Sequence, residues 1–230
     1  MTFKTDVPGW MTDADLNVLY KLASMVPESG SILEVGCFLG RSTSALYSGK
    51  HSSVTLTVVD TFQKHTGYDT DYDIFKERVN SIGESYVDAY GSKELYNMAR
   101  AIAGKEDSWL NGFKLCIGEE MYNSLYVNKT KFDNFDTRNS NYNLAFIDAS
   151  HLKQDAVNDI SRFVSNNNTL IVGDDFDPKY ISGVISAIVE VRRANKHLLI
   201  VPENSKLWIL VPREGYWKEQ FRNSNSCFFD

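Results

Sequence analysis

Two glycines that follow an apolar run are the first residues here whose types and spacing point to chemistry. Residues 31–35 include Ile32, Leu33 and Val35, and Gly36 and Gly40 come next, just before a predicted helix. Glycine lets the backbone turn tightly and approach a ligand, and the first amides of a helix are unpaired. The arrangement predicts a nucleotide-type cofactor site, with a plain structural turn as the alternative.

Phe38 stands between these two glycines. A dinucleotide-binding loop needs a glycine where the pyrophosphate touches the backbone, so the pattern favours a ligand without a diphosphate at the turn. The residues of the turn and of the helix start that we expect to bind the cofactor are Gly36, Cys37, Phe38, Gly40, Ser42 and Thr43.

Two acids extend this candidate site. Asp60 ends an apolar strand about 20 residues after Gly40, where a Rossmann-like sheet places a carboxylate that binds ribose hydroxyls. Glu119 follows a further predicted strand and is the candidate contact near an adenine ring. Both have structural alternatives, because Asp60 could cap a turn and Glu119 could favour a helix N-terminus.

Three more acids and a histidine follow the next two predicted strands. Asp148 ends one strand, and Asp174 and Asp175 follow the other. Parallel strands end at the same edge of a sheet, so these carboxylates would repel one another unless a divalent cation or bound protons neutralised them. Oxygen ligands favour Mg²⁺, Mn²⁺ or Ca²⁺. His151 is a candidate base or metal ligand, and the alternative is that the acids only cap a helix and form a turn.

An alternation of short strands and helices must position these residues. We predict strands at 31–35, 54–59, 113–117, 144–148, 169–173, 197–201 and 207–211, and helices near 13–25, 41–47, 71–81, 119–127, 153–164 and 181–194. Only residues 202–205 join the last two strands, so one of them must run antiparallel to its neighbour. The pattern predicts an α/β fold with a Rossmann-like, mostly parallel seven-stranded sheet, helices on both faces and a C-terminal antiparallel hairpin.

The chain of 230 residues is predicted to form a single domain, residues 1–230. The connection at about 61–112 is too long for one crossover helix and is rich in aromatic and polar residues. We expect an insertion that covers the substrate, with His65 as a candidate substrate contact, and a helical elaboration is the alternative.

Composition limits the partners. The net charge is −6, and no cluster of Lys and Arg suggests nucleic acid as a partner. No apolar run reaches the roughly 18 residues that span a bilayer, so we expect no membrane partner. The start of the chain lacks the apolar core of a signal peptide, and three widely spaced cysteines indicate a reducing cytoplasm. A small molecule is the expected partner, and the N-terminal helix is a candidate homodimer contact.

Taken together, the motifs resemble the class I S-adenosylmethionine-dependent methyltransferases, in particular the branch of macrolide-sugar and related small-molecule O-methyltransferases. The likeness covers most of the chain. It is carried by Gly9-Trp10, Glu34-Val35-Gly36-Cys37-Phe38-Leu39-Gly40, Val59-Asp60-Thr61-Phe62, His65-Thr66-Gly67, Phe146-Ile147-Asp148-Ala149-Ser150-His151 and Gly173-Asp174-Asp175-Phe176.

The resemblance implies roles for these residues. Glu34, Gly36 and Gly40 would hold the methionine part of the cofactor, and Asp60 would hold its ribose. Asp148, Asp174 and Asp175 would hold Mg²⁺, which would polarise the substrate oxygen while His151 removes its proton. Asp148 therefore belongs to the expected catalytic, cofactor and metal sets. Phe38 departs from the family's middle glycine, and Ser150 stands where many relatives have an acid, so the ligand set could be smaller or include His151.

We therefore expect an S-adenosylmethionine-dependent methyltransferase that methylates a hydroxyl of a small molecule or sugar, with Mg²⁺ as a candidate second cofactor. One alternative is a non-catalytic cofactor- or sugar-binding protein on the same fold, which the Phe38 substitution favours. The other is an NAD-dependent oxidoreductase, which Asp60 favours but which the missing third glycine and the terminal hairpin disfavour.

Overall fold

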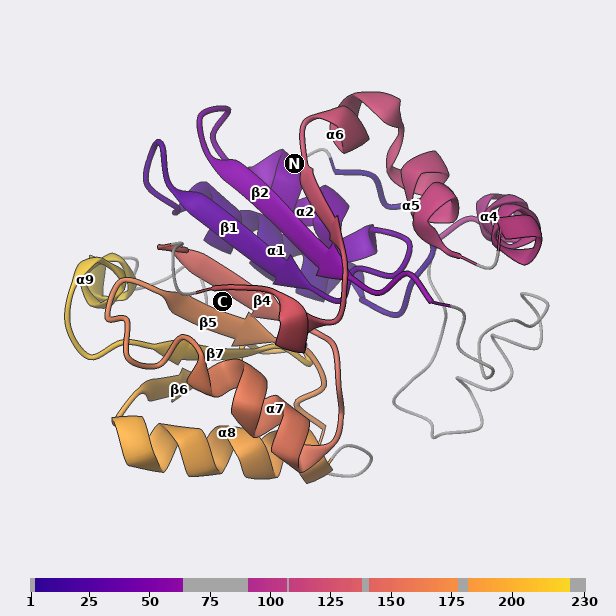
Figure 1. Ribbon diagram of the computed structural model, residues 1–230. Helices are drawn as coiled ribbons and strands as arrows, with labels where there is room; N and C mark the ends of the chain where they lie inside the picture. The colour runs from indigo at the N-terminus through magenta and orange to yellow at the C-terminus, as the bar shows by residue number, and fades with distance from the viewer. Residues whose placement is uncertain (1–2, 64–90, 107, 138–140, 178–181, 224–230) are drawn as a thin grey trace.

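A seven-stranded sheet forms the centre of the computed structural model, which describes residues 3–63, 91–106, 108–137, 141–177 and 182–223. Its order is β3-β2-β1-β4-β5-β7-β6 (Figure 1). The pairs from β3 to β5 are parallel, and β7 runs antiparallel to both β5 and β6. The strands are β1 Ser31–Val35, β2 Thr55–Asp60, β3 Tyr126–Lys129, β4 Leu144–Ile147, β5 Leu170–Gly173, β6 Leu198–Ile200 and β7 Trp208–Val211.

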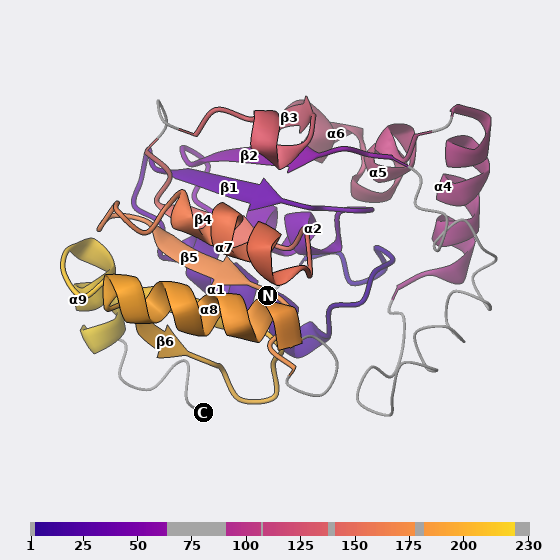
Figure 2. The ribbon, with the colours of Figure 1, turned by 60° about the horizontal axis from the view of Figure 1, so that its bottom comes forward.

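Helices cover both faces of this sheet (Figures 1 and 2). One face packs against α1 Asp13–Ser24, α2 Arg41–Gly49, α5 Leu110–Ile117, α6 Glu119–Asn123 and α9 Tyr216–Asn223, and α4 Lys93–Glu106 packs against α5 beside the sheet. The other face packs against α7 Lys153–Ser161, α8 Ser182–Asn195 and the short 3₁₀ helix η1 Phe132–Asn134. The predicted fold class is confirmed, including the antiparallel hairpin at the end of the sheet.

The strands are apolar on both sides because both sides are covered. In β4, Leu144 and Phe146 belong to the core that contains α1 and α2, while Ala145 and Ile147 belong to the core that contains α7 and α8. All four residues are buried. This burial on both faces is the reason why parallel strands read as continuous apolar runs rather than as alternating ones.

A buried acid fastens the terminal hairpin to the first helix. Asp15 closes the capping box of α1 with Thr12. Its other carboxylate oxygen accepts hydrogen bonds from the Ser205 hydroxyl at 2.7 Å and the Lys206 amide at 3.0 Å. Because these contacts hold the connection between β6 and β7, they set the position from which the Lys206 side chain reaches the pocket described below.

The third strand was predicted in the wrong place. Residues 113–117 are the end of helix α5, and the strand is β3, whose first two residues fall at the end of the predicted helix 119–127. A short apolar run cannot distinguish a buried strand from a buried helix, and Phe113, Cys116 and Ile117 are spaced as on one face of a helix. β3 lies at the edge of the sheet, and its four residues are exposed or half-buried, so it lacks the apolar pattern that marks the other strands.

The described part of the predicted insertion consists of residues 61–63, 91–106 and 108–112, which include helix α4 and the start of α5. The predicted helix at 71–81 and the candidate contact His65 lie outside the described residues. Within the described part of the chain, no helix is both long and apolar enough to cross a bilayer.

Candidate active site

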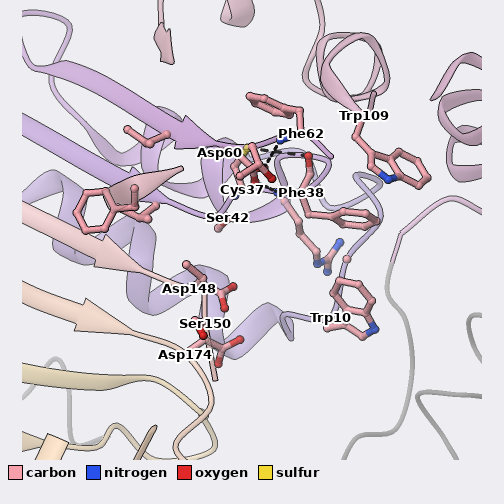
Figure 3. Close-up of a pocket in the computed structure, with 18 of the residues that line it drawn as sticks. Trp10, Cys37, Phe38, Ser42, Asp60, Phe62, Trp109, Asp148, Ser150 and Asp174 are labelled. Atoms are coloured by element: carbon pink, nitrogen blue, oxygen red, sulfur yellow. Dashed lines mark hydrogen bonds between the residues drawn. The ribbon is translucent and has the colours of Figure 1, made fainter. Parts of the chain in front are cut away.

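A pocket of about 570 Å³ opens at the carboxyl ends of β1, β2, β4 and β5. The strand order reverses between β1 and β4, and ligands of open α/β sheets bind at such a point. Figure 3 shows Asp60 and the glycine turn on one side of it and Asp148 and Asp174 on the other. The lining includes the N-terminal segment Pro8–Met11, the turn after β1, the ends of β2, β4 and β5, and Trp109, Thr130, Phe132 and Lys206.

The turn after β1 requires glycine at two positions for different reasons. Gly36 has a φ of +80°, and a Cβ added there would lie 1.8 Å from the carbonyl oxygen of Asp148. Gly40 has a φ of +91°, and a Cβ there would lie 2.3 Å from Ile117 and 2.8 Å from Phe113. Gly36 therefore lets the ends of β1 and β4 meet beside the pocket, whereas Gly40 lets α2 pack closely against α5.

Asp60 organises this turn through backbone hydrogen bonds. Its Oδ2 atom accepts from the amides of Cys37 at 2.9 Å and Phe38 at 3.2 Å. Its Oδ1 atom accepts from the amide of Phe62 at 2.6 Å. The carboxylate at the end of β2 thus joins the turn to the segment that follows β2, and the partners that a charged group needs in this position are supplied by the backbone.

Phe38 adopts a left-handed backbone conformation, with a φ of 48°. Its ring centroid lies 5.0 Å from that of Trp10 and 5.4 Å from that of Trp109. The conformation that a glycine would adopt freely is therefore maintained by the Asp60 carboxylate and by ring contacts on two sides (Figure 3). The side chain is part of the pocket wall.

Glu34 lies beneath the turn, fully buried in β1. Its Oε1 atom accepts a 2.5 Å hydrogen bond from the Ser42 hydroxyl, whereas Oε2 has no hydrogen-bond partner among the described residues. Burial raises the pKa of Glu34 from its ordinary 4.5 to about 7, against the opposing effect of the Ser42 hydrogen bond. Ser42 lines the pocket, but Glu34 does not.

This raised pKa makes a prediction about stability. Between pH 4.5 and 7 the unfolded chain ionises Glu34 while the folded protein keeps it neutral, so the contribution of Glu34 to stability is greatest below pH 4.5 and is lost as the pH rises through 7. Glu34→Gln removes this loss, which is on the order of 3 kcal/mol. We expect the stability of the variant relative to the wild type to improve by that order between pH 4.5 and 8, measured by urea unfolding. The exposed Glu203→Gln serves as the control with no such trend, and parallel profiles for Glu34→Gln and the wild type would contradict the prediction.

Two carboxylates and an imidazole meet on the other side of the pocket. Asp148, His151 and Asp175 each present a ligand atom, and these atoms lie within 4.8 Å of one another. His151 Nε2 lies 2.7 Å from Asp175 Oδ2. Two of the three acids expected as metal ligands, Asp148 and Asp175, belong to this group, together with His151, which the sequence left open as a ligand.

Asp174 faces a different partner. Its Oδ2 atom lies 3.8 Å from the Lys206 ammonium, and its Oδ1 atom accepts from the amide of Asp175. Its carbonyl oxygen accepts a hydrogen bond from the Trp208 indole. Asp174 lines the pocket but is engaged with Lys206, whereas Asp175, with a φ of +70°, turns its carboxylate to His151.

The acids shift one another's protonation. Loss of hydration, followed by repulsion from Asp174 and Asp175, raises the pKa of Asp148 well above its ordinary value. Burial raises the pKa of Asp174 to about 7, although Lys206 opposes the rise. The hydrogen bond to Asp175 raises the pKa of His151. These carboxyl groups carry unfavourable negative charge that a cation would relieve.

The structure places the predicted site residues in two groups. Those that line the pocket are Gly36, Cys37, Phe38, Ser42, Asp60, Asp148, His151, Asp174 and Asp175. Those that do not line it are Glu34, Gly40, Thr43 and Glu119. Burial raises the pKa of the Cys37 thiol well above its ordinary value, in keeping with the role of a small buried hydrophobe.

The premise that placed Glu119 near an adenine was wrong. Glu119 begins helix α6, is exposed, and pairs with Lys114 at 3.3 Å. The residues that follow the true third strand and line the pocket are Thr130 and Phe132. No sequence signal marked these two, because β3 itself was not recognised. Trp10 was marked only by the family resemblance, and Trp109 only by the aromatic content of the insertion.

Comparisons with known proteins agree with this architecture. No family model matches the chain, and no curated protein matches its sequence. A solved protein of Corynebacterium glutamicum is similar, with a TM-score of 0.53 and 12% identity over 91% of this chain and 85% of its own. The O-methyltransferase NovP gives a TM-score of 0.50 at 14% identity, over 86% and 79% of the two chains. CalS11, a calicheamicin methyltransferase, gives 0.50 at 15%, over 88% and 78%.

At these identities the comparisons establish the fold alone. The chain has the Rossmann-like fold of the class I methyltransferases, and its structural neighbours include O-methyltransferases. The resemblance inferred from the sequence motifs is confirmed at this level.

Proposed function

We propose that the protein is an S-adenosylmethionine-dependent methyltransferase that acts on a hydroxyl oxygen of a small molecule, preferably a sugar, in the cytoplasm. The observation that carries the proposal is the pocket in which the Asp60-bound turn faces Asp148 (Figure 3), with His151 and Asp175 beside Asp148. The methyltransferase fold of NovP and CalS11 supports it. The net charge of −6 argues against nucleic acid as the acceptor.

Asp60 retains capacity for a ribose hydroxyl. A carboxylate offers about four acceptor positions, and the backbone amides described above use three of them. The Oδ1 atom, with one amide, is the better placed to accept from a ribose. The amides of Cys37 and Phe38 already donate hydrogen bonds to Asp60. We therefore propose that the turn holds the cofactor through its shape and through Asp60 rather than through these two amides.

The acidic side of the pocket fits a divalent cation. Asp148 and Asp175 supply hard oxygen ligands, and Mg²⁺ sites commonly combine one or two carboxylates with water and substrate. A divalent cation bound here would polarise the acceptor oxygen and stabilise the negative charge that develops on it. We assign the cation to Asp148 and Asp175 and leave Asp174 with Lys206.

His151 is then the group that receives the proton of the acceptor hydroxyl, held in position by Asp175. In the transfer the acceptor oxygen forms a bond to the methyl carbon as the bond from that carbon to sulfur breaks. The electron pair of the broken bond stays on sulfur, and the product is S-adenosylhomocysteine. The pocket contributes mainly by aligning the two reactants.

Isothermal titration calorimetry of the purified protein tests the proposal. We expect S-adenosylhomocysteine to bind with micromolar affinity, about −8 kcal/mol, and NAD⁺ not to bind. Mg²⁺ is expected to bind in a separate titration, and a chelator should remove that signal. Bound S-adenosylhomocysteine would justify a screen of hydroxylated acceptors for methylated product by mass spectrometry.

Three results would count against the assignment. Binding of NAD⁺ alone would favour an oxidoreductase, which the Phe38 side chain in the pocket wall argues against. Binding of S-adenosylhomocysteine without methylation of any hydroxylated acceptor would favour the non-catalytic alternative. Failure of both ligands to bind would contradict the proposed cofactor.

A further inference from the structure

The N-terminal segment of residues 5–13, here called the N-terminal wall, runs along the pocket and ends at the first residue of helix α1. Its residues Pro8 to Met11 line the pocket, although they lie far in the sequence from the sheet. Backbone contacts hold this segment in part, since Gly9 forms a β-bridge and the Ser92 amide donates to the Asp6 carbonyl oxygen at 2.7 Å. Side chains that reach it from other elements supply the remaining contacts.

Arg41, the first residue of α2, supplies such contacts. Its Nε donates to the carbonyl oxygen of Met11 at 2.7 Å, and Nη1 donates to those of Thr5 at 2.5 Å and Val7 at 2.9 Å. Nη2 lies 3.2 Å from Asp13 Oδ1. The side chain is 4% exposed, so a charged group has been withdrawn from water and satisfied by one short stretch of backbone.

The aliphatic part of Arg41 also shapes the wall. A Cβ added at Gly9 would lie 3.1 Å from both Cβ and Cδ of Arg41. The backbone at Gly9 therefore lies directly on the side chain. Arg41 contacts the wall with its stem at Gly9 and with its guanidinium on both sides of Gly9, which leaves little freedom for the residue that follows, Trp10.

Phe38 links the wall to the turn that is bound by Asp60. The Trp10 and Phe38 rings lie 5.0 Å apart, and the Phe38 amide donates to Asp60. Figure 3 shows Trp10 and Phe38 on the same side of the pocket, with Trp109 beyond Phe38. Movement of the wall would therefore disturb the turn in which the cofactor would sit.

We infer that Arg41 is a positioning residue that fixes the N-terminal wall against the pocket, and that Phe38 couples the wall to the cofactor turn. The identity of the ligand in this inference rests on the proposed function. The positioning role itself, in which Arg41 fixes Trp10, does not depend on any ligand.

Trp10 provides a direct readout. The chain contains four tryptophans, and Trp109, Trp208 and Trp217 are at most 2% exposed, whereas Trp10 is half-buried. Quenching of tryptophan fluorescence by acrylamide therefore reports mainly on Trp10, and Trp10→Phe identifies its share of the signal. A role of Arg41 in overall stability alone would not change this share in the folded protein.

The experiment compares the wild type with Arg41→Met, which keeps the stem but removes the donors, and with Arg41→Lys, which keeps the charge. Asp13→Asn is the matched control, since it removes only the contact to a carboxylate that is 68% exposed. We expect the quenching constant of Trp10 to rise roughly twofold in Arg41→Met, less in Arg41→Lys, and not in Asp13→Asn. The affinity for S-adenosylhomocysteine should fall about tenfold or more in Arg41→Met.

Phe38→Gly tests the coupling. In the wild type, S-adenosylhomocysteine should lower the quenching of Trp10, and in Phe38→Gly this protection should be lost. Unchanged quenching in folded Arg41→Met would overturn the inference, as would increased quenching with unchanged affinity. If Arg41→Met does not fold, unchanged quenching and affinity in Arg41→Lys have the same meaning. If the wild type does not bind S-adenosylhomocysteine, the proposed cofactor fails, and the quenching of the free proteins alone decides the role of Arg41.

Discussion

Replacement of Asp60 by alanine is expected to weaken the binding of S-adenosylhomocysteine about 100-fold, which corresponds to about 2.7 kcal/mol. Asp60 accepts hydrogen bonds from three backbone amides and is the proposed ribose ligand. Hydrogen bonds to a charged group contribute about 1.5–3 kcal/mol each, so the loss of the ribose contact alone accounts for much of this change. Calorimetric titration of the variant, after circular dichroism has confirmed that it folds, measures the effect.

Glu119→Gln is the matched control for this prediction. Glu119 is the other acid expected from the sequence to contact the cofactor, but it is exposed at the start of α6 and lies outside the pocket lining. We expect its affinity to stay within about twofold of the wild type, in line with exposed ion pairs of small energetic weight. Retained affinity in folded Asp60→Ala, or a large loss in Glu119→Gln, would show that the cofactor lies elsewhere.

The contrast between these two acids shows which parts of the site could be predicted. Asp60 lies at the end of a strand that is buried on both faces, and such a strand can be recognised in the sequence as an apolar run. The same holds for the residues that follow β1, β4 and β5. Glu119 was placed by a strand that is in fact the helix α5, while the edge strand β3 has no apolar pattern to recognise. Thr130 and Phe132 were missed for the same reason.

Other parts of the site depend on contacts between distant residues. Arg41 reads as the ordinary start of a helix, yet it binds carbonyl oxygens 30 to 36 residues away. The sequence brings Asp174 and Asp175 to the same edge without indicating which one turns toward His151. Asp175 turns toward His151 because Lys206 forms an ion pair with Asp174 and because the backbone of Asp175 is left-handed. Strand periodicity specifies the edge of the sheet but not the direction of side chains within a turn.

His151 is expected to have the largest effect on catalysis. His151→Ala should lower kcat for the acceptor found by screening about 10²–10⁴-fold, the range typical of a general base. The physical reason is the dyad in which Asp175 holds the imidazole at 2.7 Å beside Asp148. His51→Ala is the matched control, since His51 is an exposed histidine that pairs with Glu28 and lies outside the pocket lining. Steady-state kinetics at saturating S-adenosylmethionine measures both.

Mg²⁺ titrations of the same proteins separate a base from a metal ligand. If His151 acts as the base, Mg²⁺ should bind His151→Ala with nearly wild-type affinity, because Asp148 and Asp175 remain, whereas Asp148→Asn should lose Mg²⁺ binding. If His151→Ala instead loses both Mg²⁺ binding and activity, the imidazole is a metal ligand. An activity of His151→Ala within about threefold of the wild type would exclude both roles, because each predicts a change far larger than surface substitutions cause. The acceptor proton would then have to leave through the carboxylate of Asp148 or through solvent.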